Sequence, residues 1–383
     1  ARVLPGFEPD AKLKMLMQLS SQAELVIVIS AKDIEKHKIR SDIGITYDLD
    51  VLRLIQSFRS KELYVGSVVI THYEAQKSAD KFKAKLESLG IKVYRHYIID
   101  GYPSNVELIL SEEGYGKNNY IKTERPLVIV TAPGPGSGKM ATCLSQLYHE
   151  HKRGIKAGYA KFETFPIWNL ALKHPVNIAY EAATADLNDV NMIDPFHLEA
   201  YNTTAVNYNR DVEIFPVLTS IFEGIFGECP YKSPTDMGVN MAGNCIFDDE
   251  VCKEASLQEV IRRYYSSLNR LVKEECRPEE LYKIELLMKQ AKISTEARKV
   301  VSAALLKAET SEGPAAAMEL ADGRLITGKT SDLLGASAAL ILNATKALAG
   351  IDKEVHLISP TVIEPVQTLK TRYLGSTNPR LHT

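Results

Sequence analysis

The residues best suited to chemistry lie between positions 132 and 139, where the sequence reads APGPGSGK. Its three alternating glycines let the backbone curl so that several N–H groups face one centre. A helix that starts here also offers N–H groups without intrahelical partners and the positive end of its dipole. The segment therefore predicts a cradle for a phosphate or another anion. Its expected binding residues are Gly134, Gly136, Ser137, Gly138 and Lys139.

This loop departs from the patterns that bind nucleotides elsewhere. The triphosphate loop GxxxxGK[ST] needs glycine at 133 and a hydroxyl at 140, where this chain has Pro133 and Met140. The pattern G-x-G-x-x-G also fails, because Lys139 occupies the place of the third glycine. ATP hydrolysis of the ordinary P-loop type is therefore not expected. A plain strand-to-helix turn with a solvated lysine stays open as the alternative.

A second group of chemically capable residues is acidic and includes one histidine. Asp186 and Asp189 are three apart, as are Asp194 and His197, so each pair would share a face if the segment is helical. Carboxylates suit Mg²⁺, which makes Asp186 and Asp189 the metal candidates. His197 could act as an acid or base near neutral pH, so Lys139, Asp194 and His197 are the catalytic candidates. The simpler alternative is that these side chains cap helices, since Asp194 precedes a proline.

The elements that must position these groups alternate between strand and helix over residues 1 to about 225. Short β-rich apolar runs without polar alternation indicate strands covered on both faces. The expected strands are Leu25–Ser30, Leu63–Thr71, Ile91–Tyr97, Asn105–Leu110 and Pro126–Thr131, with helices between them such as Asp48–Arg59 and Ala75–Leu89. This alternation predicts a parallel sheet with helices on both faces. The glycine-rich loop follows the last strand directly, at the carboxyl edge where such sheets bind ligands.

The second half of the chain changes pattern. Residues 248–307 carry only helical spacing, and residues 315–327 read as a β-hairpin. An alanine-rich helix from about 331 to 348 and a strand at Val355–Ser359 follow. We expect three domains: an α/β domain at 1–228, a helical subdomain at 229–310 and a small α/β domain at 311–383.

Composition limits the partners and the compartment. The 383 residues are 45% hydrophobic and 25% charged, with a net charge of −2, as in globular proteins. This charge gives no reason to expect nucleic acid, and no apolar run approaches the ~20 residues that cross a bilayer. Five cysteines without a CxxC pair argue against a disulfide framework and a thiolate zinc site. We expect a cytoplasmic protein, and a trimmed chain because it starts with alanine; a homo-oligomer stays open.

Four long stretches carry a resemblance to a known family. They are ARVLPGFEPDAKLKML, ISAKDIEKHKIRSDIGITYDLDVLRLI, TAPGPGSGKMATCLSQLYHEHKRGIKAGYAKFETFPIWNL and DLNDVNMIDPFHLEAY. The chain resembles, over its whole length, a bacterial family catalogued as domain of unknown function eighteen forty-six. That resemblance implies a Rossmann-like first domain, a helical insert and a small C-terminal α/β domain of cytidine-deaminase-like topology, here truncated.

The resemblance implies no established activity, so no catalytic residue is carried over from the family. The deaminase zinc signature H-x-E…P-C-x-x-C has no counterpart between residues 315 and 383, and a similar fold does not imply that chemistry.

The sequence leaves two ligand-binding functions open, besides a structural or interaction protein in which the loop is only a turn. The first is an enzyme, a transferase or hydrolase, that binds a phosphorylated small molecule or nucleotide at the 132–139 loop and transfers a phosphoryl or other group, with Mg²⁺ accompanying a nucleotide. The alternative is a non-catalytic regulatory protein that binds a phosphorylated metabolite.

Overall fold

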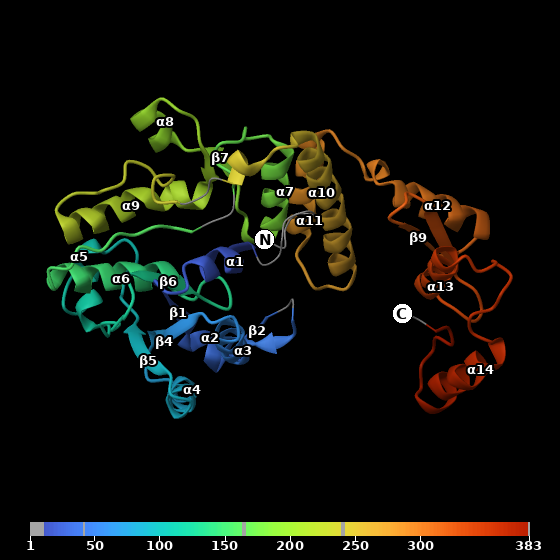
Figure 1. Cartoon of the computed structure of the whole chain (residues 1–383), viewed down its shortest axis with the longest axis horizontal. Helices are drawn as coiled ribbons and strands as arrows, with labels where there is room; N and C mark the ends of the chain where they lie inside the picture. The colour runs from blue at the N-terminus through green and yellow to red at the C-terminus, as the bar shows by residue number, and fades with distance from the viewer. Residues whose placement is uncertain (1–10, 41–42, 163–165, 239–241, 382–383) are drawn as a thin grey trace. The chain divides into compact units, whose positions relative to one another are not determined.

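The computed structural model describes residues 11–40, 43–162, 166–238 and 242–381 (Figure 1). The first ten residues of the family-like stretches therefore lie outside the described residues. The chain forms two compact units, Ala1–Ser256 and Leu257–Thr383. The expected domain boundaries after residues 228 and 310 stay predictions, since the compact units divide at a different place.

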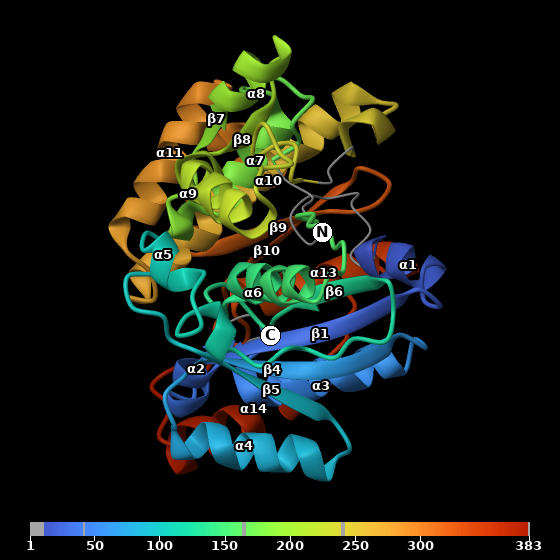
Figure 2. The same cartoon turned by 90° about the vertical axis from the view of Figure 1, so that its left-hand side faces the viewer.

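A four-stranded parallel sheet organises the first unit. Its strands are β1 (Ala23–Ser30), β4 (Tyr64–Tyr73), β5 (Lys92–Tyr97) and β6 (Leu127–Thr131), in the order β5-β4-β1-β6. Figure 2 shows them side by side in this order. The chain runs outward from β1 to β5 and then returns to the other side of β1. This is the order of the first four strands of a Rossmann sheet, and it places the switch point between β1 and β6. The predicted parallel sheet is confirmed.

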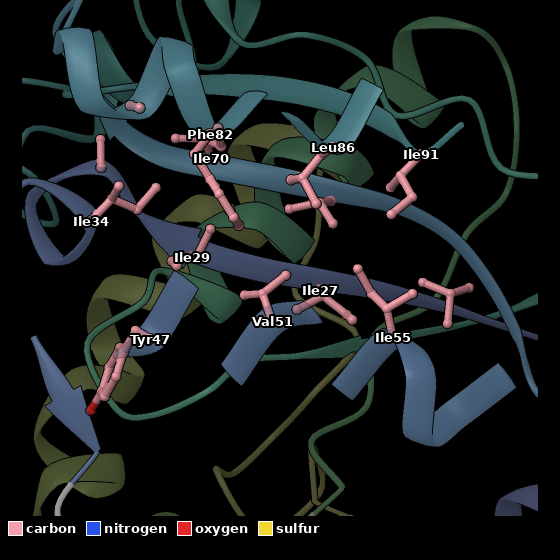
Figure 3. Packing of buried hydrophobic residues seen from close by; sticks show 14 of the residues in the cluster. Ile27, Ile29, Ile34, Tyr47, Val51, Ile55, Ile70, Phe82, Leu86 and Ile91 are labelled. Atoms are coloured by element: carbon pink, nitrogen blue, oxygen red, sulfur yellow. The ribbon is translucent and has the colours of Figure 1, made fainter. Parts of the chain in front are cut away.

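The strand β1 is buried along its whole length, because neighbouring segments cover both faces of the sheet. Alternate residues of β1 point to opposite faces. Ile27 and Ile29 pack with α2 (Ala31–Glu35), α3 (Tyr47–Arg59) and α4 (Lys77–Ser88), as Figure 3 shows. Val26 and Val28 pack on the opposite face with Val128 and Val130 of β6. Burial on both faces explains why β1 lacks polar alternation.

One predicted strand of this unit is wrong. Asn105–Leu110 contains the short helix α5 (Val106–Ile109) instead of a strand. The Asn105 side chain accepts a hydrogen bond from the N–H of Leu108 at 3.2 Å, which caps the helix start. The apolar run is then explained by burial of Ile109 in a helical core cluster.

The remainder of the first unit is mostly helical. It comprises α1 (Ala11–Gln18), the small antiparallel pair β2 (Ile39–Arg40) and β3 (Ile45–Thr46), α6 (Lys139–Lys152), α7 (Pro175–Ala183), the antiparallel pair β7 (Asn191–Ile193) and β8 (Val206–Tyr208), α8 (Pro195–Tyr201) and α9 (Asn209–Phe226). Leu144 and Leu147 of α6 share a buried cluster with Phe215 and Phe222 of α9. This cluster joins the segment after α6 to the sheet domain.

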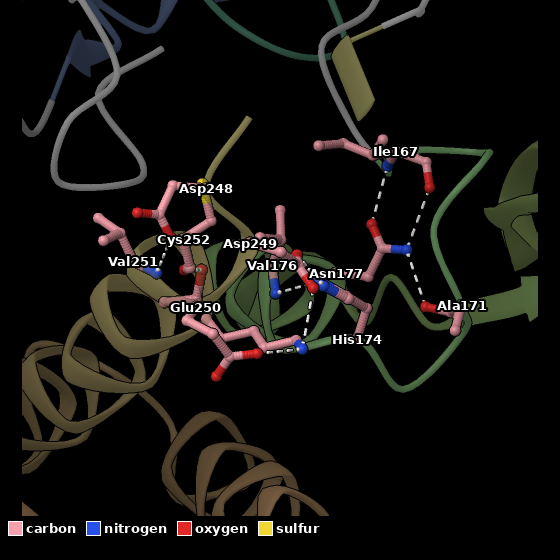
Figure 4. Close-up of polar contacts among 12 residues, drawn as sticks. Ile167, Ala171, His174, Val176, Asn177, Asp248, Asp249, Glu250, Val251 and Cys252 are labelled. Carbon is pink, nitrogen blue, oxygen red and sulfur yellow. Dashed lines mark hydrogen bonds and ion pairs between the residues drawn. The ribbon is translucent and has the colours of Figure 1, made fainter. Parts of the chain in front are cut away.

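Polar contacts at the start of α7 tie it to neighbouring segments (Figure 4). The buried Asn177 side chain accepts from the N–H of Ile167 at 2.8 Å and donates to its carbonyl at 3.1 Å. His174 caps α7 through Nδ1, and its Nε2 lies 2.8 Å from Asp249 Oδ1 at the start of α10 (Asp249–Val272). These contacts are structural.

The second unit contains the rest of α10 and a small hairpin with helices. Its elements are α11 (Pro278–Ala291), α12 (Lys299–Ser311), the antiparallel strands β9 (Ala315–Glu319) and β10 (Leu325–Lys329), α13 (Ala336–Ala349) and α14 (Pro360–Thr368). The predicted hairpin is confirmed. The predicted strand Val355–Ser359 is wrong, because residues 355–359 are irregular and β9–β10 pair only with each other within the described residues. The cytidine-deaminase-like topology stays a prediction.

Candidate functional site

The glycine-rich loop joins β6 to α6 at the switch point of the sheet. Gly136 and Gly138 have φ values of +75° and +86°, which non-glycine residues rarely adopt. Gly138 is the N-cap of α6, so the turn delivers the chain directly into the first turn of a 14-residue helix. The N–H groups of that first turn have no partner within the helix. The predicted order of strand, loop and helix is confirmed.

Close packing requires glycine at a third position in the loop. A Cβ built at Gly134 would lie 2.3 Å from Oη of Tyr47, the first residue of α3. Tyr47 is only 6% exposed, and Lys38 Nζ lies 4.9 Å from its ring centre, so the ring has little room to move. This close contact holds the loop against α3, which packs on one face of the sheet.

The two polar side chains of the loop both bind a loop carbonyl. Ser137 is fully buried, and its Oγ donates to the Gly134 carbonyl at 3.0 Å. Lys139 Nζ donates to the same carbonyl at 3.3 Å. The ammonium group of Lys139 therefore lies beside the turn instead of extending into solvent. A bound anion would meet this charge together with the N–H groups of the helix start.

Thr71, near the end of β4, forms a hydrogen bond to the loop although β1 lies between β4 and β6. Its Oγ1 donates to the Ser137 carbonyl at 2.7 Å, and a Cβ at Gly138 would lie 3.2 Å from the same hydroxyl. Since β1 lies between β4 and β6, the loop must pass over the carboxyl end of β1 to reach Thr71. The carboxyl ends of three strands thus meet at one place.

His72 belongs to this meeting point, although its sequence pattern alone did not reveal it. Its backbone has a φ of +50°, at the point where the pairing of β4 with β5 shifts register between Ile70 and Tyr73. The ring Nδ1 lies 3.1 Å from Ser30 Oγ at the end of β1 and 3.3 Å from Thr71 Oγ1. Strained backbone and β-bulges both occur often at functional sites. Polar residues directly after a buried strand were the available signal.

Burial sets the protonation of His72. Burial lowers the pKa of the imidazole below 6.5, and the charge of Lys32 lowers it further. Asp33 and Glu74 act in the opposite direction on this pKa and do not reverse the shift. His72 is therefore mostly neutral at pH 7, with one ring nitrogen as donor and the other as acceptor.

Asp194 has a structural role, because its carboxylate links α8 to the segment that contains Thr235. The fully buried carboxylate caps α8 by accepting from the N–H of His197 at 3.1 Å, as the proline after it predicts. It also accepts from the N–H and the hydroxyl of Thr235, at 3.2 and 2.5 Å. These bonds pin residues 233–236 to α8. They explain a buried carboxylate without catalysis.

His197 lies beside a serine and an aspartate without forming a hydrolase triad. Its Nδ1 is 3.0 Å from Ser233 Oγ and 3.7 Å from Asp236 Oδ1. A catalytic triad needs these two partners on different ring nitrogens, so this geometry does not prepare Ser233 as a nucleophile.

The two metal candidates lie in different environments. Asp189 is buried and pairs with Arg210 at 3.2 Å, whereas Asp186 is on an exposed 3₁₀ turn. No cluster of three or more His, Cys, Asp or Glu side chains suited to a metal ion occurs in the described part of the chain.

The four-stranded parallel sheet with a glycine-rich turn at its switch point defines an α/β protein. In open α/β sheets, ligands generally bind at the carboxyl ends of the strands. No helix within the described ranges is both long enough and apolar enough to cross a bilayer. The family model described as "Domain of unknown function DUF1846, N-terminal" matches residues 1–292, and its C-terminal counterpart matches residues 296–383. The chain belongs to this family.

Relatives from streptococci support the same assignment. UPF0371 protein SUB1165 of Streptococcus uberis and UPF0371 protein str1377 of Streptococcus thermophilus are each 59% identical to the chain over 382 residues. UPF0371 protein/M5005_Spy1095 of Streptococcus pyogenes serotype M1 is 58% identical over the same length. Each alignment covers 100% of this chain and 77% of the relative.

Proposed function

We propose that this bacterial protein binds a phosphorylated small molecule or nucleotide at the loop Gly134–Lys139, on a Rossmann-like sheet. The observation that carries the proposal is the left-handed backbone at Gly136 and Gly138, which leads into the first turn of α6 at the switch point of the sheet. The N–H groups of that first turn have no partner within the helix, and together with the helix dipole they attract an anion there. The Lys139 ammonium, already beside the turn, supplies a full positive charge.

The reaction we propose for this site is phosphoryl or group transfer in the cytosol, as a transferase or hydrolase. Lys139 would offset charge that develops on the transferred group, and the loop N–H groups would hold its oxygens. Asp194 fits a structural role better than a catalytic one, because its oxygens already accept hydrogen bonds from His197 and Thr235. Of the two carboxylates proposed for Mg²⁺ brought by a nucleotide, Asp186 is exposed and fits that role better, because Asp189 is buried and pairs with Arg210.

The test is ligand-induced stabilisation measured by thermal unfolding. Phosphate, sugar phosphates, ADP and ATP with and without Mg²⁺ are added to the wild type, Lys139→Ala and Lys152→Ala. Lys152 is the matched control, because it lies in the last turn of the same helix and pairs with Glu112. A ligand at 100 times its dissociation constant adds about 2.7 kcal/mol. We expect stabilisation in the wild type and Lys152→Ala and its loss in Lys139→Ala. The absence of a shift in the wild type across the panel refutes the proposal.

A non-catalytic regulatory role is the second candidate. It is favoured by the fact that both polar side chains of the loop, Ser137 and Lys139, hydrogen-bond to a loop carbonyl. Phosphorus NMR of each stabilising ligand incubated with the protein separates the two candidates. New phosphorus signals that require Lys139 indicate an enzyme, and unchanged spectra with retained binding indicate a regulator.

A further inference from the structure

The side chains of Ser30, Thr71 and His72 meet beside the glycine-rich loop at the carboxyl ends of β1 and β4. Thr71 joins this cluster to the loop through the Ser137 carbonyl. We infer that His72 is part of the ligand site and takes up a proton when a phosphorylated ligand binds. This inference rests on the proposed function and adds to it a proton-linked recognition of doubly charged anions.

The hydroxyl partners of His72 suit both protonation states. Ser30 Oγ already accepts from the N–H of Lys32 at 3.2 Å, and its own O–H can donate to Nδ1 of a neutral imidazole. In that state Nε2 carries the proton and is a donor. When Nδ1 is also protonated, Ser30 Oγ or Thr71 Oγ1 can accept from it. A proton can therefore be gained without leaving Nδ1 unpaired.

The charges around His72 make this proton uptake depend on the ligand. Burial and Lys32 keep the ring mostly neutral in the absence of an anion, with Asp33 and Glu74 opposing them. A doubly negative group beside the ring favours the charged imidazolium and so raises its pKa. By linkage, a ligand that raises the pKa of His72 binds more tightly to the protonated protein.

A buried hydroxyl on the first turn of α6 gives independent support for a polar ligand here. Thr142 Oγ1 is fully buried and has no hydrogen-bond partner within the described residues. The Cα–Cβ bonds of a helix tilt toward its N-terminus, so the Cβ of Thr142 leans toward the Gly138 end of α6. Buried polar groups are rarely left unpaired, and a bound anion would supply the missing acceptor.

Sulfate binding measured by calorimetry from pH 5 to pH 8.5 tests the inference. Sulfate is a good probe because it stays a dianion over this whole range, so any pH dependence comes from the protein. The variants are His72→Asn and His72→Gln, with His151→Gln as control. Asparagine tolerates the left-handed backbone at this position. His151 lies in the last turn of α6, at the opposite end of the helix from Gly138.

We expect the affinity of the wild type to be highest at low pH and to fall as pH rises from the pKa of free His72 to that of the bound form. Each unit by which sulfate raises the pKa of His72 lowers the affinity for sulfate tenfold between these two pKa values, and we expect a total loss of about tenfold. Heats measured in two buffers of different ionisation enthalpy will show proton uptake at intermediate pH. The control should behave like the wild type, and both His72 variants should give a flat profile.

Three results decide between the proposals. A flat profile in folded His72 variants supports the inference. Binding with the same pH profile in the wild type and in either folded His72 variant overturns it and leaves the proposed anion site intact. If neither sulfate nor any phosphorylated ligand of the panel binds the wild type, the proposed function fails and the inference with it.

Discussion

Replacing Gly134 with alanine tests whether the loop is held as tightly as its contacts with α3 indicate. The new Cβ would lie 2.3 Å from Oη and 2.7 Å from Cζ of Tyr47, distances at which one group must move. Tyr47 is buried in the core between α3 and the sheet, so its ring cannot swing into solvent without losing that packing. Overpacking of this kind costs about 1–3 kcal/mol. For a unit of this size we expect a fall in melting temperature of about 2–4 °C per kcal/mol.

Gly158→Ala is the matched control, because nothing lies within 4 Å of its Cβ position and its φ is not in the left-handed region. There the substitution should be neutral or should stabilise by about 0.4–1 kcal/mol, through the unfolded chain. Urea unfolding by fluorescence and circular dichroism gives both free energies of unfolding. Introducing Tyr47→Phe removes the nearest atom and should reduce the cost of Gly134→Ala by at least about 0.5 kcal/mol. Equal stabilities for Gly134→Ala and Gly158→Ala would show that the loop is not packed as described.

Three further predictions follow from buried groups. Asp194→Ala should lower the free energy of unfolding in urea by about 2–3 kcal/mol, because the cap of α8 and charge-assisted hydrogen bonds are lost. Asp186 is exposed, so Asp186→Ala should change this free energy by no more than about 0.5 kcal/mol. Equal effects of the two substitutions would contradict the structural role of Asp194. Burial lowers the pKa of His96 to about 4, so the unfolded chain binds a proton at higher pH than the folded chain does. The free energy of unfolding should therefore fall by about 3 kcal/mol as pH drops from 6.5 to 4. His96→Gln should flatten this pH dependence, and an unchanged slope would exclude His96 as its source. Desolvation raises the pKa of the partly buried Cys143 thiol to about 12, so iodoacetamide should modify exposed Cys245 first in the native protein, as peptide mass spectrometry can check. Faster labelling of Cys143 would contradict this raised pKa.

The sheet and the loop could be predicted because their signals are local. The run LVIVIS has no polar residue before its final serine, and only burial on both faces explains such a pattern. The glycines at 136 and 138 predict a loop backbone that curls tightly, and in the structure both have the left-handed conformation. Short apolar runs carry less information, since a strand and a buried helical turn look alike over four residues. At Asn105–Leu110 the hydrogen bond from the N–H of Leu108 to the Asn105 side chain stabilises the start of a helix.

The other wrongly predicted strand, Val355–Ser359, is absent for a reason that a local sequence pattern does not contain. Val355–Ser359 has the composition of a strand, but a strand also needs a neighbour for its N–H and C=O groups. The described residues of the second unit contain one hairpin, in which β9 pairs with β10 alone. The side chains of Val355, Leu357 and Ile358 remain exposed. Pairing is a property of the whole fold, so composition alone could not decide it.

His72 shows the same limit at the candidate site. Its place beside the loop depends on three facts that are far apart in sequence: β4 lies next to β1, β1 lies between β4 and β6, and β4 changes register before Tyr73. Without that register shift, strand alternation would decide where the ring points, as it does along β1. The shift and the φ of +50° instead place Nδ1 at the end of β1, against Ser30. Residues 186–197 looked richer in functional groups, yet there Asp194 and Asp189 are occupied in holding helices and loops. The order of the strands, more than the density of charged residues, positions the residues of the candidate site.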